Sequence, residues 1–424
     1  VGDIDVDAVE GKIKSIFADI PAAVNPKAKE TIQFKEFTEP RVAVITDPET
    51  TSPSVEMVWE SEARDESLNA TAIGLMNDLI ENVVQSVMSE RFNDITSKAD
   101  APYLYGSFGF GKLCEVIEGA DGNVSLKEDN ILGGFKAFVT ELERMKRYGF
   151  TEGEVNRAKD NIIAYYEKAA NQADTRKNSE FVNPLINNFF SSYAILEPAT
   201  RLELVKAIFG QINAQVMNQV LTQAFADQNS LVVIYSGPEK EGIATPTTEQ
   251  LLQVVEEVKK SEIEAPVEET SNEPLMDPSA LAGGKVKKTS KTIYGATEWV
   301  LSNGARVVVL PTEYKKDQIL FSFYKAGGES LIPTEDLPSF DGSIFSVFQS
   351  AQGVSKFKGT ELSKMLSGKM VSVNPFIDDL YNGISGNSSA KDLETAFQLL
   401  YLEFTDPRFD QEEYDNATAQ IKAV

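Results

Sequence analysis

Alternating aspartates near the start of the chain are the first residues whose type and spacing could bind a metal ion. Asp3, Asp5 and Asp7 have the spacing that opens a calcium-binding loop. Such a loop needs a glycine at its sixth position and a closing glutamate, but Ala8 and Lys14 stand there in this register. Aspartates before an apolar helical segment also cap helices, because their carboxylates accept hydrogen bonds from the first free N–H groups. We therefore predict helix capping here and no calcium site.

Two further patterns could carry chemistry. Adjacent carboxylates at Asp378 and Asp379 could supply the paired acids of a glycosidase, whose chemistry depends on a distance that sequence does not give. The glycines Gly106, Gly109 and Gly111 could cradle a phosphate. No helix is expected directly after Gly111, so no helix dipole would meet the phosphate. We predict a strand in which glycine allows close packing.

The chain contains no histidine among its 424 residues. This excludes histidine-ligated metal sites and both Ser-His-Asp and Cys-His catalysis within the chain. The single cysteine, Cys114, allows no internal disulfide. Because it stands in an apolar run, we predict a buried core cysteine.

The net charge of −25 argues against a nucleic-acid partner, since phosphate binding requires clustered Lys and Arg. The one basic cluster, at residues 285–291, is short, and we interpret it as part of a solvated linker. No apolar run is long enough to span a membrane. No signal peptide is recognisable.

Residues 299–366 contain the most informative local pattern. Asn303-Gly304 stands between two apolar runs and predicts a hairpin. A third strand is expected over residues 319–326, then a helix over about 341–352, and a second helix opening at Thr360. Elsewhere, strand pairs likewise alternate with long helices. The pattern indicates an α+β fold, a mainly antiparallel sheet with helices packed on it.

An internal repeat indicates two copies of one unit. Phe, Glu, Ala and Ile recur at four-residue steps in 150–162 and in 409–421, which places them along one side of a helix. We expect a complete first copy at 1–237 and a linker with one helix at 238–292. A second, truncated copy is expected at 293–424.

Four short segments resemble the pitrilysin/insulysin-type (inverzincin) zinc metallopeptidase family. In that family a strand ends in Ala-Gly-x-x-(Glu or Asp), a helix carries His-x-x-Glu-His, and Phe-x-Gly-Thr follows. Here the segments at 326–329 and 357–360 read Ala-Gly-Gly-Glu and Phe-Lys-Gly-Thr. Gly2-Asp3 and Phe17-Ala18-Asp19-Ile20-Pro21 match the start of the family's second, non-catalytic repeat.

The resemblance places the five metal-site positions at residues 350–354, which read Ser-Ala-Gln-Gly-Val. None of these side chains could bind zinc as imidazole or act as a carboxylate base. Ser350, Gly353 and Val354 are therefore degenerate metal-site positions, and we assign no catalytic or metal-binding residue. The substrate-binding residues stay unassigned.

The resemblance implies a repeated α/β sandwich of the metallopeptidase-repeat type. The chain would correspond to the second repeat, the linker and the front of the third repeat, with the catalytic first repeat upstream of Val1. Its expected role is chamber wall and hinge in a zinc-dependent enzyme that degrades peptides. By itself it would be inactive, with zinc held by the missing catalytic repeat.

The implied partners are a peptide substrate and either the catalytic repeat of the same polypeptide or an active partner subunit. The alternative function is a degenerate peptide-binding or assembly subunit that pairs with an active metallopeptidase subunit. An upstream reading frame with His-x-x-Glu-His would favour the first function, and one without it the second. The family resemblance also implies a bacterial cell envelope or periplasmic location.

Overall fold

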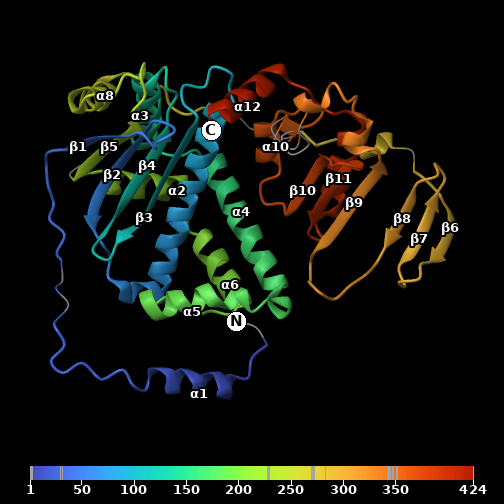
Figure 1. Ribbon diagram of the computed structural model, residues 1–424, viewed down its shortest axis with the longest axis horizontal. Coiled ribbons are helices and arrows are strands. Elements are labelled where there is room, and N and C mark those ends of the chain that lie inside the picture. The colour runs from blue at the N-terminus through green and yellow to red at the C-terminus, as the bar shows by residue number, and fades with distance from the viewer. Residues whose placement is uncertain are drawn as a thin grey trace. The chain divides into compact units, whose positions relative to one another are not determined.

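The structure is a computed structural model of the chain (Figure 1). It describes residues 3–28, 30, 32–226, 230–268, 273–281, 283–340, 345, 348–349 and 352–423. The chain divides into two compact units. Unit 1 comprises Val1–Lys159, Arg176–Glu268 and Thr418–Val424, and unit 2 comprises Asp160–Thr175 and Glu269–Ala417.

Unit 1 is built on a five-stranded sheet with the order β1-β5-β2-β4-β3. Strand β5 pairs in parallel with β1 and antiparallel with β2, so the last strand of the unit closes the sheet between the first two. The remaining pairs are antiparallel. The strands are β1 (Arg41–Asp47), β2 (Ser54–Glu62), β3 (Tyr105–Cys114), β4 (Ile117–Ser125) and β5 (Leu231–Pro238).

Helix α2 packs against this sheet and α8 lies along α3, whereas α1 buries no residue and lies apart from the sheet (Figure 1). Helix α4 contributes residues 152–159 to unit 1 and its remainder to unit 2. The helices are α1 (Val6–Phe17), α2 (Ala72–Thr96), α3 (Ile131–Tyr148), α4 (Glu152–Asn171), α5 (Ser179–Ser191), α6 (Pro198–Phe209), α7 (Ala214–Ala224) and α8 (Thr248–Lys260).

The core of unit 1 follows from period-two alternation in β2. Val55, Met57 and Trp59 alternate with more polar residues and are buried on one face of the strand. Helices α2 and α3 meet over the sheet, where the Phe92 and Phe138 rings stack with centroids 5.3 Å apart. Aromatic burial of this kind supplies much of a core's hydrophobic stabilisation.

A buried ionic cluster joins α2, α3 and the start of α4. Arg91 Nε and Nη2 donate to the two carboxylate oxygens of Glu154 at 2.6 and 2.9 Å. Its Nη1 donates to Glu141 at 3.3 Å and its Nη2 to the Gly149 carbonyl at 2.9 Å. Burial alone would raise the pKa of Glu154, but the hydrogen-bonded guanidinium lowers it below the ordinary value. The cluster thereby fixes where α4 begins.

Unit 2 contains two three-stranded antiparallel sheets, in the orders β10-β11-β9 and β6-β7-β8. The strands are β6 (Val286–Lys291), β7 (Thr297–Leu301), β8 (Arg306–Val309), β9 (Ile319–Ala326), β10 (Val371–Ile377) and β11 (Tyr381–Ser388). Its helices are α10 (Gly359–Met365), α11 (Leu393–Thr405) and α12 (Gln411–Ala423), of which residues 411–417 belong to the unit.

The Asn-Gly hairpin is confirmed between β7 and β8. Gly304 takes φ +89° and donates its N–H to the Leu301 carbonyl at 3.0 Å. Asn303 keeps a negative φ, and its side-chain oxygen accepts from the Ala305 N–H at 3.1 Å. Only the glycine therefore needs the left-handed region at this turn.

Several expectations about local structure were wrong. Cys114 is exposed, because β3 shifts register between Lys112 and Cys114 just before the hairpin to β4. The basic cluster forms strand β6, Val-Lys-Lys-Thr-Ser-Lys, which pairs with β7 and is not a linker. A short 3₁₀ helix, Glu66–Ala70, precedes α2.

The α+β fold with a mainly antiparallel sheet is confirmed in both units, and the expected duplication is visible in their element order. Strands β2, β4 and β3 followed by α3 and α4 correspond to β9, β11 and β10 followed by α11 and α12. The predicted domain boundaries stay a prediction. Helix α8, from the predicted linker, belongs to unit 1 and lies along α3.

Replacing Arg91 with methionine tests the ionic cluster. Glu154 would stay buried without its cation, whereas Glu141 keeps its contact with Arg144. We expect the free energy of unfolding to fall by about 3 kcal/mol, measured by urea denaturation.

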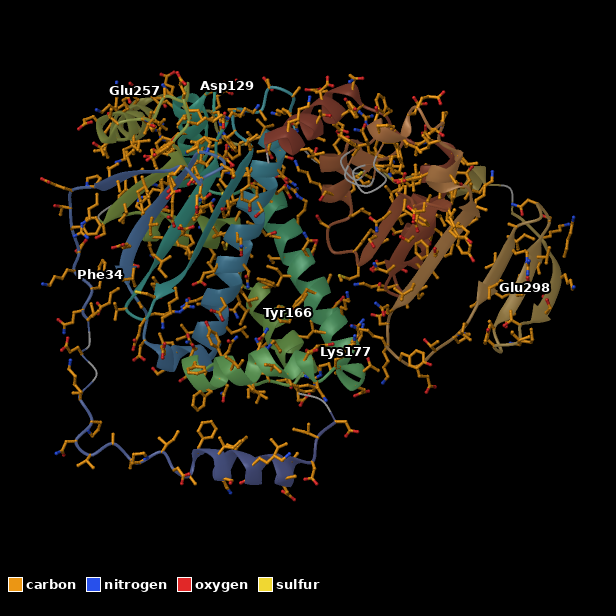
Figure 2. The ribbon with its side chains drawn as sticks, viewed as in Figure 1. Phe34, Asp129, Tyr166, Lys177, Glu257 and Glu298 are labelled. Atoms are coloured by element: carbon orange, nitrogen blue, oxygen red, sulfur yellow. The ribbon has the colours of Figure 1, made fainter. Side chains whose placement is uncertain are left out.

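The matched control is Lys136→Met, which removes the surface ion pair that Lys136 of α3 makes with Glu257 of α8. Figure 2 labels Glu257 on α8. Both side chains of that pair are about half exposed, so stability should hardly change. Equal effects of the two substitutions would contradict the role assigned to Arg91.

Candidate functional site

The degenerate metal-site positions lie in unit 2, between β9 and α10. Ser350 falls outside the described residues, as does the neighbouring residue 351. Gly353 and Val354 are described, so the local role of these two positions can be established directly.

Gly353 lies where the main chain folds against itself. It takes φ +70°, and a Cβ added there would lie 2.2 Å from the Phe357 carbonyl oxygen and 2.6 Å from the Gly359 nitrogen. Both atoms are main chain and neither can move aside cheaply. The position therefore accepts no side chain without a backbone shift, which excludes a glutamate in this conformation.

Val354 is fully buried and paired by its backbone. Its N–H donates to the Phe357 carbonyl at 3.1 Å, and the Phe357 N–H donates back at 3.0 Å. The side chain packs with Leu399 and Leu402 of α11. At this position the family's motif places a zinc-binding histidine, and here the chain places core packing.

Gln352 is a buried polar residue next to Gly353 in the chain. It is 3% exposed, and its side-chain oxygen accepts from the Asp410 N–H at 2.5 Å. Asp410 in turn caps α12, accepting from the N–H groups of Glu412 and Glu413. Burial alone would raise the pKa of Asp410, but these contacts and the Arg408 guanidinium lower it. The polar groups here hold the start of α12.

Glu403 of α11 is the most perturbed carboxyl near the degenerate site. Burial raises its pKa to about 7, against a smaller opposing effect from Gln349, whose Nε2 donates to it at 3.1 Å. A shifted carboxyl often marks a functional site. Among the described residues, burial dominates the shift of the Glu403 pKa and only the Gln349 amide opposes it, so the shift here follows from packing.

The other carboxylates singled out in the sequence have structural roles. Asp5 caps α1, with its carboxylate accepting from the Ala8 N–H at 2.9 Å. Asp378 and Asp379 form the turn between β10 and β11, where Asp378 accepts from the Asp379 N–H at 2.7 Å. Across the part of the chain that the structure describes, no three His, Cys, Asp or Glu residues are placed to hold a metal ion.

The glycine pattern at residues 106–111 lies within β3, as predicted, and not at a helix start. Unit 1 also holds a group that the sequence did not single out. The Lys146 ammonium lies 4.1 Å from the Trp59 ring centroid and 4.5 Å from that of Phe225, in a small cleft. Burial lowers the pKa of Lys146 to about 7, Glu143 opposes this and Lys259 adds to it. The cationic form rests on two aromatic faces, an arrangement that packs α3 against β2.

The pKa of Glu403 gives a pH-dependent prediction. Because its pKa is raised in the folded protein, its contribution to stability is complete below the ordinary value of 4.5 and is lost as pH rises through about 7. Glu403→Gln should therefore stabilise the protein by about 1–2 kcal/mol near pH 8 and change little near pH 5.

Thermal unfolding at both pH values measures this effect. Glu394→Gln, on the exposed side of the same helix, is the control and should show no such pH dependence. An unchanged unfolding temperature for Glu403→Gln at the higher pH would contradict a buried, proton-sensitive carboxyl.

The chain is similar to a known protein family model and to known proteins. Residues 1–162 match the family model described as "Peptidase M16 inactive domain". A "Zinc protease PQQL-like" protein of Arabidopsis thaliana is 22% identical over 97% of this chain and 37% of its own length. A "Probable zinc protease PqqL" of Haemophilus influenzae is 22% identical over 95% of this chain and 43% of its own length. The chain thus spans less than half the length of these relatives.

Solved structures share the fold. The periplasmic protease PqqL from Escherichia coli matches all of this chain and 46% of its own, with TM-score 0.53 and 19% identity. The ferredoxin protease FusC, solved in complex with Arabidopsis ferredoxin, matches all of this chain and 47% of its own, with TM-score 0.56 and 17% identity. Pitrilysin matches 99% of this chain and 43% of its own, with TM-score 0.51 and 10% identity.

These matches confirm the resemblance drawn from the short sequence segments and the repeated α/β sandwich. Residues 1–162 match the peptidase M16 inactive domain, and along nearly its whole length the chain is similar to zinc proteases of the PqqL type and shares the fold of pitrilysin.

Proposed function

We propose that this chain is the non-catalytic wall and hinge of a zinc-dependent metallopeptidase that degrades peptides, and that it does not hydrolyse peptides by itself. The observation that carries the proposal is the packing of Gly353 and Val354. One position has no room for a side chain, and the other lies in the core of unit 2. The match of residues 1–162 to an inactive domain supports the same role for unit 1.

Zinc does not fit the residues at the degenerate site. Zinc in such enzymes takes imidazole and carboxylate ligands, and here a buried valine and a glycine occupy the matching described positions. We therefore assign zinc to a catalytic repeat in the same polypeptide or in an active partner subunit. The peptide substrate is the other partner of the proposed assembly.

The location proposed for the whole protein is the bacterial cell envelope or periplasm. Support comes from the Escherichia coli PqqL structure, which is that of a periplasmic protease. Among the described residues, none of the helices combines the length and apolar character that crossing a membrane requires.

A zinc and peptidase assay tests the proposal. The purified chain is incubated with zinc and fluorogenic peptides of acidic, basic and neutral composition, with a zinc peptidase as positive control. We expect no cleavage above buffer, and no saturable zinc binding by calorimetry. Cleavage that scales with the chain's concentration and stops with a chelator would contradict the proposal.

A second arm separates the proposed role from that of an assembly or peptide-binding subunit. The chain is mixed with a separately produced catalytic repeat from the same reading frame. Restored peptide cleavage in the mixture would support the proposed role of the chain as the wall and hinge of the enzyme. If the reading frame encodes no His-x-x-Glu-His and the chain instead binds peptides or an active subunit, the assembly-subunit function replaces the one proposed.

A further inference from the structure

Lys146 of α3 carries an amine that leaves solvent without meeting a polar partner. Its ammonium lies 4.1 Å from the Trp59 ring centroid and 4.5 Å from that of Phe225. Among the described residues, no hydrogen bond or ion pair involves this ammonium. Lysine amines removed from water are normally paired, because an isolated buried charge is costly. An amine that is buried and unpaired is therefore a candidate for chemistry of its own.

A small cleft with mostly apolar walls surrounds the amine. The cavity measures about 10 Å³, which limits an occupant to a few atoms. Its apolar walls come from β2, α3, β5 and α8, all in unit 1. They are Met57, Trp59, Val139, Leu142, Leu231 and Val255. Such walls favour a small apolar molecule over a hydrated ion.

Near neutral pH, much of the Lys146 amine is uncharged. Burial lowers its pKa from 10.5 to about 7, Glu143 opposes this effect and Lys259 adds to it. About half of the molecules therefore carry a neutral amine at about pH 7, whereas an ordinary lysine is almost entirely charged. Only the neutral amine has the free electron pair that attacks carbon. The cleft thus holds a nucleophile beside apolar walls.

The charged groups around the cleft favour an anion at this position over a cation. Glu143 is already bound by Arg147, whose Nε donates to it at 2.8 Å. Lys259 reaches the cleft from α8, which lies along α3 (Figure 1), and its partly exposed ion pair with Glu256 at 3.3 Å is weak. The strands at the cleft contribute only apolar side chains, as does the segment after α7. An anionic group on Lys146 therefore gains attraction from Lys259, where the ammonium meets repulsion.

We propose that Lys146 is a site of reversible carbamate formation, at which carbon dioxide adds to the Nζ atom and the Lys259 ammonium holds the product carboxylate. The neutral nitrogen forms a bond to the carbon of CO₂, one C–O π pair moves onto oxygen, and a proton leaves the nitrogen for solvent. An amine and CO₂ thus give a carbamate and a proton, with no further reactant. CO₂ is small and apolar, as the size and walls of the cleft require. The inference is independent of the proposed function.

Labelled carbon dioxide tests the site on the full chain. The protein is equilibrated with isotopically labelled bicarbonate and CO₂ at about pH 7.5, and the carbamate carbon is detected by NMR. A trialkyloxonium salt then alkylates the carbamates, and peptide mass spectrometry locates them. We expect occupancy at Lys146 to exceed that at Lys136, a half-exposed lysine of the same helix, by about tenfold or more. Equal occupancy at the two lysines, or bound bicarbonate without a carbamate signal, would overturn the proposal.

Two neighbouring lysines of α8 test the role of Lys259. Lys259→Met should lower the carbamate occupancy at Lys146 by about fivefold or more, because the carboxylate loses its cation and the pKa of Lys146 rises. Lys260→Met is the matched control, because the Lys260 side chain is 77% exposed and does not line the cleft, although it pairs with the same Glu256. Its substitution should leave the occupancy unchanged. Equal occupancy in the two variants would overturn the role of Lys259.

Lys146→Arg tests whether the NMR signal arises in the cleft. Arginine keeps a cation over the two aromatic rings, but its guanidinium stays protonated and forms no carbamate. The Lys146 signal should disappear, and only that of the chain's α-amino group, with an ordinary pKa of about 8, should remain. If the variant is not folded by circular dichroism, Lys146→Met takes its place. An undiminished signal in a folded variant would overturn the assignment to Lys146.

Discussion

In each unit, a buried polar side chain from the segment after β2 or its counterpart β9 holds the start of a later helix, α4 in unit 1 and α12 in unit 2. In unit 1, Arg91 of α2 binds Glu154 in the first turn of α4. In unit 2, Gln352 accepts from the Asp410 N–H at the start of α12. An unpaired helix terminus inside a core is costly, so each copy must satisfy these groups. The packing of the helices on each sheet, and the local structure of residues 352–354 in unit 2, therefore depend on these two contacts.

This constraint explains how the frame of a catalytic repeat persists without its chemistry. In the family, the helix after the strand that ends in Ala-Gly-x-x-(Glu or Asp) carries the zinc motif. In unit 2, the same segment supplies Gln352 to α12, main-chain closure at Gly353 and core packing at Val354. Each of these roles is satisfied by residues that a metal site could not use. The segment has therefore kept its structural role, and its described residues serve that role.

Local signals in the sequence predicted local structure well. The Asn-Gly turn and the bounds of β9 are set by residues adjacent in the chain, and both were found where expected. The prediction that Cys114 is buried was wrong. Its exposure follows from a register shift in β3, and that shift depends on how β3 pairs with β4. The pairing of β5 between β1 and β2 joins segments almost 200 residues apart, and no local pattern encodes it.

The degenerate metal-site positions stay a prediction from the sequence, and the contacts of the residues around them could not be predicted. Nothing in the sequence distinguishes Gln352 or Glu403 from other polar residues of helices. Their burial, which perturbs the pKa of Glu403, arises only when the unit packs. Lys146 likewise gains its surroundings from β2 and the end of α7.

The most direct test of this account is native-state hydrogen exchange at the Val354 and Phe357 amides, with and without zinc. These two residues exchange hydrogen bonds with each other, and the Val354 side chain lies in the core of unit 2. If the degenerate position serves packing, both amides should exchange as slowly as those of α11, and zinc should leave their rates unchanged. Rapid exchange that slows when zinc is added would contradict the account, because it would show an open, metal-responsive site.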